Sequence, residues 1–224
     1  LRDRRMIEAE RASPEERGAL LLAIRRAGVR DIAILRAMET TPREAFTPYR
    51  FRDLANRNIS LPIGCGQTMT RPVDLARRIA ALGVEKRHRV LDVGAGSGYG
   101  AAILAQLANE VVAIERYQAL AIEAAAHLTT LGIGNARVLH ADGLAPSPEL
   151  GGFDRIFVEA AILSPPAALI SALNPGGALL YARAGTSARQ RLIKLVCNSP
   201  GVFEETDLGP CRLVFSTEGQ AETL

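Results

Sequence analysis

The sequence predicts an α/β fold with a doubly wound, mostly parallel sheet and a helical segment in front of it. From residue 89 onward, short runs rich in β-branched residues alternate with longer stretches of helical periodicity, the pattern of βαβ units. The first run leads into a glycine-rich segment, RVLDVGAGSGYG at 89–100, as a strand does where it turns tightly into a helix. The 224 residues, 48% of them hydrophobic, suffice for one such domain.

The N-terminal segment carries helix signals. Residues 13–16 (SPEE) and 41–44 (TPRE) both match a capping box, with a hydroxyl at the N-cap, proline next and glutamate at the third helical position. Helices should begin at both places, and the first should run to about Ala27 and end at Gly28. Apolar spacing predicts further helices at 33–38 and 73–82.

The rest of the chain predicts the sheet and its crossover helices. We expect strands at 89–94, 111–115, 136–140, 153–158 and 177–183, and helices at 99–108, 118–131 and 166–173. Two more apolar runs, RLIKLVC and CRLVF, follow near the C-terminus and are separated by Pro200, Gly201 and Pro210. They predict two further strands at an antiparallel end of the sheet.

The glycine-rich segment indicates a loop that holds a nucleotide-type cofactor. Gly94, Gly96 and Gly98 let the backbone turn and approach a ligand closely, and Asp92 stands two positions ahead of them. The dinucleotide pattern G-x-G-x-x-G fails, because Tyr99 stands where its third glycine belongs. An acidic residue followed by G-x-G-x-G remains.

Two later strands also end in carboxylates. Glu115 closes VVAIE, and a ribose diol is held by two hydrogen bonds to such an acid. Asp142, followed by Gly143, ends ARVLHADG. Taken singly, each acid also fits a helix cap or a solvated charge. Three acids at three successive strand ends form a more specific constellation.

This constellation resembles the class I S-adenosylmethionine-dependent methyltransferases. The resemblance implies a Rossmann-like sheet, S-adenosylmethionine as cofactor, and a place for Asp142 at the adenine amino group. It divides the chain into an N-terminal helical segment and substrate loop at 1–72 and a cofactor-binding α/β domain at 73–224, in one continuous globular unit. The cofactor-binding residues it implies are Asp92, Gly94, Gly96, Gly98, Glu115, Asp142 and Gly143.

Two segments narrow the resemblance. LPIGCGQTMTRP at 61–72 and PREAF at 42–46, with Pro48 after it, are similar to signatures of the protein-L-isoaspartate O-methyltransferases. GVRD at 28–31 and PGG at 175–177 also agree, so the resemblance covers about residues 20–195. It implies methylation of the α-carboxylate of L-isoaspartyl residues in damaged proteins, whose ester then collapses to a succinimide and so allows repair.

The resemblance also implies roles for the substrate loop. Thr70 stands where the family has its active-site serine, so its hydroxyl is expected to orient the substrate carboxylate or the cofactor. Gln67 and Thr68 are expected to line the same cleft. The alternative is that Thr70 caps the helix that begins near Pro72.

Some residues depart from the family pattern. Threonine replaces serine at position 70, and Glu159 ends the fourth strand where the family has small residues. An anion in the cleft would repel a carboxylate substrate, unless Glu159 faces away or pairs with Arg183. Two alternatives therefore stay open: a methyltransferase for another acceptor, such as a small-molecule carboxylate or RNA, or a cofactor-binding homologue without repair activity.

Composition limits the partners and the compartment. The net charge is +3, but the basic residues are scattered among 24 acids, so we expect no nucleic-acid partner. The 3 cysteines and 3 histidines lack metal-ligand spacing, and we expect no metal. Without a signal-peptide pattern or a long apolar run, we expect a cytoplasmic protein that does not enter membranes. The oligomeric state is not predicted.

Overall fold

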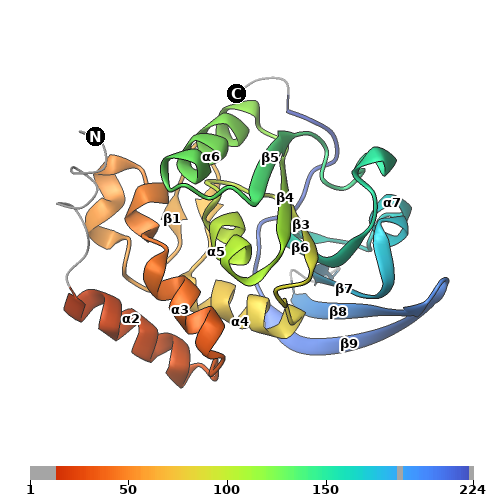
Figure 1. Cartoon of the computed structure of the whole chain (residues 1–224), viewed down its shortest axis with the longest axis horizontal. Coiled ribbons are helices and arrows are strands. Elements are labelled where there is room, and N and C mark those ends of the chain that lie inside the picture. Colours follow the sequence, from red (N-terminus) through yellow and green to blue (C-terminus); the bar gives the residue numbers. More distant parts are fainter. Residues whose placement is uncertain (1–13, 186–188, 222–224) are drawn as a thin grey trace.

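A seven-stranded sheet lies at the centre of the computed structural model, which describes residues 14–185 and 189–221 (Figure 1). Its strand order is β5-β4-β3-β6-β7-β8-β9, so the chain moves outward from β3 to β5 and then returns to the other side of β3. The strands are β3 (Arg89–Val93), β4 (Glu110–Glu115), β5 (Ala136–His140), β6 (Phe153–Ile162), β7 (Leu173–Ala184), β8 (Gln190–Ser199) and β9 (Val202–Cys211).

The sheet is parallel from β5 to β7 and antiparallel from β7 to β9, which confirms the predicted doubly wound arrangement with an antiparallel end. Its helices are α4 (Pro72–Leu82), α5 (Tyr99–Leu107), α6 (Gln118–Thr130) and α7 (Ala167–Ser171). In the N-terminal segment, α2 (Pro14–Arg26) and α3 (Ile32–Thr40) pack beside α4 and α5 (Figure 1).

Alternating strand residues build a core on each face of the sheet. Val90 of β3 packs into the cluster that contains the apolar faces of α4 and α5, whereas Leu91 and Val93 pack into the cluster that contains Leu169 of α7. Successive side chains of a strand point to opposite faces, so both clusters draw on the same strands. Burial on both faces explains the continuous apolar runs of β3 and β4.

Short elements connect α3 to the sheet. Two 3-10 helices, Arg43–Phe46 and Tyr49–Leu54, follow α3, and the third, Pro148–Leu150, precedes β6. A small hairpin of β1 (Leu61–Pro62) and β2 (Thr68–Met69) follows the second of these 3-10 helices, Tyr49–Leu54, and precedes α4. The division of the chain at residues 72 and 73 falls at the start of α4 and stays a prediction.

One of the two predicted capping boxes is wrong. Thr41 does not begin a helix: it ends α3, with its backbone N–H bonded to the Ala37 carbonyl, and only a 3-10 helix follows Pro42. The Thr41 hydroxyl instead accepts a hydrogen bond from Gln106 of α5. The other capping residue, Ser13, lies outside the described residues, but α2 begins at Pro14 and stops before Gly28 as predicted.

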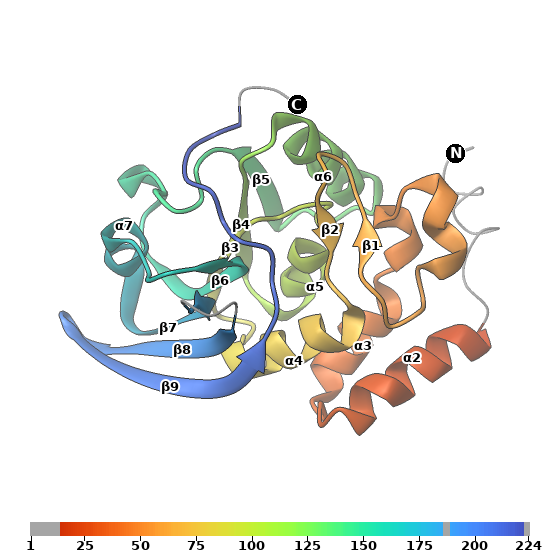
Figure 2. The same cartoon turned by 180° about the vertical axis from the view of Figure 1, so that it is seen from behind.

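The last strand differs from the prediction. CRLVF does not form it; Val202–Cys211 pairs with β8 instead, and Pro200 and Gly201 lie in the turn between them. The strand contains Gly209 and Pro210, which a strand prediction avoids, but β9 is the edge of the sheet, where a missing N–H costs no ladder bond. The chain after Cys211 runs back along the sheet toward α6 (Figure 2).

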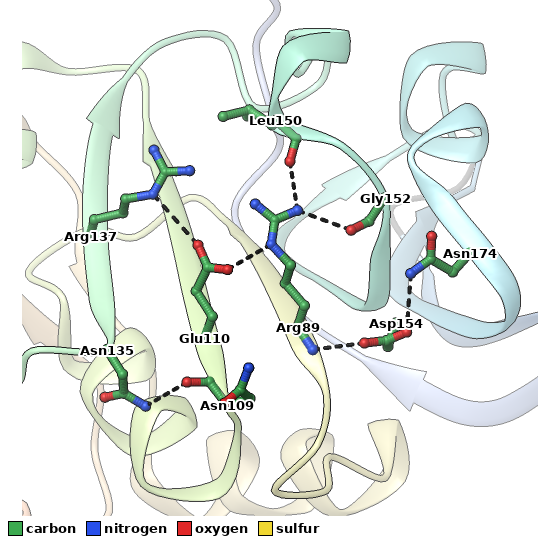
Figure 3. Close-up of polar contacts among 9 residues, drawn as sticks. All are labelled: Arg89, Asn109, Glu110, Asn135, Arg137, Leu150, Gly152, Asp154 and Asn174. Carbon is green, nitrogen blue, oxygen red and sulfur yellow. Dashed lines mark hydrogen bonds and ion pairs between the residues drawn. The ribbon is translucent and has the colours of Figure 1, made fainter.

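Charged side chains fix the amino ends of the strands. Arg89 donates to Glu110 at 2.7 Å and to the carbonyls of Leu150 and Gly152, and its backbone N–H donates to Asp154 (Figure 3). Hydrogen bonding to Arg89 lowers the pKa of Glu110 from its ordinary value. This cluster joins β3, β4 and β6 at the end of the sheet opposite the glycine loop.

Candidate active site

A pocket opens at the carboxyl ends of β3, β4 and β6, beside the point where the strand order reverses. Ligands of open α/β sheets bind at such reversal points, outside the carboxyl ends of the strands. The β1–β2 hairpin and the chain after β9 both lie on this side of the molecule (Figure 2). Residues of the hairpin, the glycine loop, the three strand ends, the loop after β5 and positions 214–217 form its wall.

The glycine loop crosses from β3 to the end of β4. The backbone N–H groups of Gly94 and Ala95 both donate to the Ile114 carbonyl. Gly96 has φ +54°, and a Cβ there would lie 3.2 Å from Ile63 of the hairpin, so a side chain would narrow the pocket. Gly98 is absent from the pocket wall; its Cβ would press on Ala124 of α6, so it serves close helix packing.

Glu115 joins the loop to the strand beside it. Its carboxylate accepts hydrogen bonds from the N–H of Gly96 at 2.8 Å and from the N–H of Tyr117 at 3.0 Å. The side chain is buried yet reaches the pocket wall. A carboxylate held by backbone donors at a strand end can still accept from hydroxyl groups of a ligand, because it has about four acceptor positions.

Asp142 and Gly143 line the pocket after the end of β5. Asp142 accepts from the N–H groups of Leu144 and Gly219, both at 2.8–2.9 Å, so it ties residue 219 to the end of β5. Gly143 is required for packing, because a Cβ there would lie 2.6 Å from Val93.

The residues after β9 form a wall of the pocket that the sequence did not predict. Val214 and Ser216 exchange backbone hydrogen bonds with Ala161 of β6, and Ala221 donates to the Arg116 carbonyl. Val214, Phe215, Ser216 and Thr217 therefore lie across the carboxyl edge of the sheet. We call residues 212–221 the C-terminal segment. Irregular chain held by scattered hydrogen bonds has no periodic signal by which sequence reasoning could find it.

The β1–β2 hairpin carries the predicted substrate loop. Gln67 closes its turn by donating to the Gly64 carbonyl, and Cys65 at the tip has φ +58°. Gln67, Thr68 and Thr70 all line the pocket, as expected for the cleft. The amide of Gln67 also donates to the Tyr117 hydroxyl at 3.5 Å.

Buried Arg43 holds this hairpin in place. Its guanidinium donates to the carbonyls of Ala55, Ile59 and Thr70 at 2.8–3.0 Å, which fixes the chain on both sides of the hairpin. Burial lowers the pKa of Arg43 to about 10, so it keeps its charge at neutral pH. Arg43 belongs to the PREAF motif, but nothing in the sequence indicated that its side chain binds backbone carbonyls.

Thr70 is not a helix cap. The N-cap of α4 is Arg71, which makes no side-chain cap bond, and the N–H of Val73 is bonded to the Asn58 side chain. The Thr70 hydroxyl instead lies 3.4 Å from the Glu159 carboxylate and 3.3 Å from the Arg78 guanidinium.

Glu159 lies within β6, which runs on to Ile162 rather than ending near 158. Its partner is Arg78 of α4, at 2.8 Å, so neither alternative holds: Glu159 does not face away from the pocket, and Arg183 binds Glu205 on β9 instead. Residues two apart in a strand point to the same face of the sheet, so Glu159 shares its face with Phe157, which packs against α4. The Arg78 guanidinium lies over the Phe157 ring and so reaches Glu159.

Asp92 lies behind the pocket wall, fully buried, and neither of its oxygens has a hydrogen-bond partner among the described residues. Burial, together with the neighbouring Glu159 carboxylate, raises the pKa of Asp92 well above its ordinary value. The structure brings Asp92 and Glu159 together through the register of β3 and β6, which pairs Asp92 with Phe157.

Within the described ranges, no group of three or more His, Cys, Asp and Glu side chains is placed to hold a metal ion. In the same residues no helix is long and apolar enough to cross a membrane.

The reversed strand order, the glycine loop and the acids at the ends of β4 and β5 define a class I S-adenosylmethionine-dependent methyltransferase. The pocket fits this cofactor, since Glu115 presents a carboxylate and Gly96 leaves the space a Cβ would fill. Residues 15–221 match the family model described as protein-L-isoaspartate(D-aspartate) O-methyltransferase, and the chain belongs to this family. It is therefore an enzyme that methylates isoaspartyl residues with S-adenosylmethionine.

Individual relatives agree with this family assignment. A protein-L-isoaspartate O-methyltransferase of Azorhizobium caulinodans is 40% identical over 217 residues, covering 97% of this chain and 98% of the relative. One from Rhodopseudomonas palustris is 47% identical over 172 residues, covering 77% and 70%. A solved protein-L-isoaspartate O-methyltransferase structure superposes with a TM-score of 0.81 at 25% identity, covering 90% of this chain and 66% of that one. A Plasmodium falciparum structure with S-adenosyl-L-homocysteine, 22% identical over 88% of this chain and 96% of that one, shares the fold with a TM-score of 0.78.

Proposed function

We propose that this chain methylates the free α-carboxylate of L-isoaspartyl residues in damaged proteins or peptides, and that Thr70 orients that carboxylate. The observation that carries the proposal is the position of Thr70, directly after β2: it lines the same pocket as the glycine loop and Glu115, and its hydroxyl lies 3.4 Å from Glu159 of the pocket wall. An acceptor at Thr70 and a cofactor on the loop would therefore meet in one cavity.

The residues of the glycine loop and strand ends hold the cofactor in this proposal. When bound, S-adenosylmethionine supplies an electrophilic methyl group on a sulfonium. Glu115 would accept hydrogen bonds from the ribose hydroxyls, Asp142 and Gly143 would hold the adenine, and Gly94 and Gly96 would let the backbone approach closely, since all five residues line the pocket. Asp92 lies behind the wall, where burial raises the pKa of its carboxyl, and Gly98 packs the loop against α6.

The chain's own contribution to catalysis is position and exclusion of water. A carboxylate is a nucleophile at neutral pH, so no general base is needed, and the rate depends on aligning the acceptor oxygen with the methyl group. In this proposal Thr70 turns its one hydroxyl proton from Glu159, 3.4 Å away, to one oxygen of the acceptor carboxylate. Gln67 and Thr68 complete the wall. The hairpin and the C-terminal segment cover the pocket from two sides and keep water from the reacting atoms.

The cytoplasm is the proposed compartment. The three cysteines, Cys65, Cys197 and Cys211, are free thiols, as is usual for proteins of a reducing compartment. The proposed partners are damaged proteins with an exposed isoaspartyl residue.

The test is to identify the methylated product. The protein is incubated with methyl-labelled S-adenosylmethionine and an isoaspartyl peptide, and separately with cell extract divided into protein, RNA and small molecules. We expect label on the peptide and in the protein fraction as a base-labile ester, with tandem mass spectrometry placing it on the α-carboxyl group. Label confined to RNA or to small molecules, or no label with intact cofactor binding, would refute the proposal.

A further inference from the structure

A buried ion pair lies directly behind the proposed acceptor position. Arg78 of α4 donates to the Glu159 carboxylate at 2.8 Å, and the same nitrogen lies 3.3 Å from the Thr70 hydroxyl. The side chains of Arg78 and Glu159 are only 4% and 12% exposed. Thr70 and Glu159 line the pocket, but Arg78 does not, so the guanidinium acts from the second layer.

Among the described residues, Glu159 is the acidic side chain that binds Arg78. The Nε and Nη1 atoms of Arg78 are buried without hydrogen-bond partners among the described residues, and its remaining contact is with the Phe157 ring, 4.9 Å away. Burial of a charge is costly unless an opposite charge accompanies it. The nearby Asp92 makes no hydrogen bond to Arg78, since neither of its oxygens has a partner among the described residues. Glu159 is therefore the anion that matches Arg78.

The other carboxylates of the pocket wall are held differently. Glu115 and Asp142 each accept two backbone N–H groups, whereas Glu159 depends on a side-chain cation and the Thr70 hydroxyl. Of these three, Glu159 is the one in contact with Thr70. Its charge is therefore the one that a carboxylate acceptor would meet first.

An anionic acceptor makes this pairing a requirement. An unpaired Glu159 would repel the carboxylate that Thr70 is proposed to orient, because like charges in a poorly hydrated pocket interact strongly. Arg78 cancels that charge and, by donating to both Thr70 and Glu159, fixes their side chains relative to each other.

We infer that Arg78 is a specificity-determining and positioning residue: it neutralises Glu159 behind Thr70 and so makes this wall accept an anionic, carboxylate-bearing substrate. The inference rests on the proposed function, in which Thr70 faces the substrate carboxylate.

A double-mutant cycle tests the inference. Arg78→Met, Glu159→Gln and the double variant are compared with the parent for kcat and KM on an isoaspartyl peptide, with S-adenosylmethionine affinity measured by calorimetry. We expect Arg78→Met to raise KM by at least about 10-fold, because it exposes an uncompensated carboxylate. Glu159→Gln should lower KM, because it leaves the positive charge of Arg78 without a counter-charge, free to attract the carboxylate of the substrate. The double variant should return KM to within about 3-fold of the parent, because the two charges are removed together.

Conservative and matched variants separate charge balance from structural support. Arg78→Lys keeps the charge and should keep KM closer to the parent than Arg78→Met does. Arg77→Met makes the same change at an exposed neighbour on α4 and should leave KM unchanged. If Arg78→Met fails to fold, Glu159→Gln still decides, because an equal or higher KM in that variant contradicts the inference.

The outcome for the parent separates the two claims. A parent that methylates the peptide, with a KM that does not respond to Arg78 and Glu159 in this pattern, overturns the charge-balance role alone. A parent that transfers no methyl group to the peptide overturns the proposed function itself.

Discussion

The Glu115 carboxylate accepts the Gly96 N–H at 2.8 Å, so the end of β4 holds the glycine loop in the shape that the pocket needs. The acid thus has two tasks in this account: it fixes the loop and it presents oxygen atoms to the ribose hydroxyls of the cofactor. Both tasks depend on a carboxylate rather than on an amide.

Replacing Glu115 should weaken cofactor binding. Glu115→Gln loses acceptor capacity and charge while keeping its size, and we expect S-adenosylmethionine affinity to fall by roughly 2 to 4 kcal/mol. Isothermal calorimetry measures this directly. Glu110→Gln, at the opposite end of the same strand, is the control and should leave affinity unchanged. Equal affinity for the parent and Glu115→Gln would remove Glu115 from the cofactor site.

Thr70 should affect turnover rather than cofactor binding. Thr70→Val keeps the shape but removes the hydroxyl, and we expect kcat to fall by about 10- to 1000-fold, as for loss of one positioned hydrogen bond. Thr70→Ser should retain activity. Initial rates and calorimetry on the same samples check both expectations, and an unchanged kcat in Thr70→Val would contradict the proposed role.

Asp92 should make stability depend on pH. Its pKa is raised in the folded state by burial and by Glu159, with Arg78 opposing and Glu115 adding to the shift, so the folded protein binds the proton more tightly than the unfolded chain. Its contribution to stability is therefore lost as pH rises from the unfolded pKa of about 3.9 toward the raised folded value.

Asp92→Asn, which resembles the protonated acid, should remove this dependence. Melting temperatures of the parent and the variant are compared between about pH 5 and pH 9, and the gap in favour of the variant should widen with pH. Parallel curves would show that Asp92 does not titrate as a buried acid.

Asp142 should control the order of the C-terminal segment. Asp142→Ala removes the acceptor of the Gly219 N–H, so hydrogen exchange in residues 212–221 should accelerate and S-adenosylmethionine affinity should fall by about 10-fold, the loss expected for one charge-assisted hydrogen bond. Glu149→Ala, at an exposed position of the 3-10 helix Pro148–Leu150, is the control. Unchanged exchange in the segment would show that Asp142 does not hold it.

Much of the fold was predictable because local signals agree with the tertiary arrangement. The apolar runs of β3 and β4, the helix of 73–82 and the glycine φ values at 94–98 follow from periodicity and backbone sterics. The predictions that failed concern positions where tertiary contacts, and not the local sequence, determine the structure. Thr41 matched a cap at one end of a helix but capped the other end of α3, and Gly209 and Pro210 entered a strand that happens to be an edge.

The candidate site was predictable where a motif carried the chemistry. Glu115, Asp142, Gln67, Thr68 and Thr70 all reach one pocket, as expected from their segments. The partner of Glu159 was missed, because a pairing between α4 and β6 joins residues 81 apart in sequence, and nothing local to Arg78 distinguishes it from exposed Arg77.

The rate of methyl transfer to an isoaspartyl peptide, compared with the rate for its normal aspartyl twin of the same sequence, shows whether the pocket recognises the isoaspartyl carboxylate. The two differ only in which carboxyl group is free beside the backbone, so the pocket must recognise that arrangement. We expect kcat/KM for the isoaspartyl peptide to exceed that for the twin by at least about 1000-fold, since a misplaced carboxylate loses both alignment and the Thr70 hydrogen bond. Equal rates on the two peptides, or none on either with cofactor bound, would contradict the account.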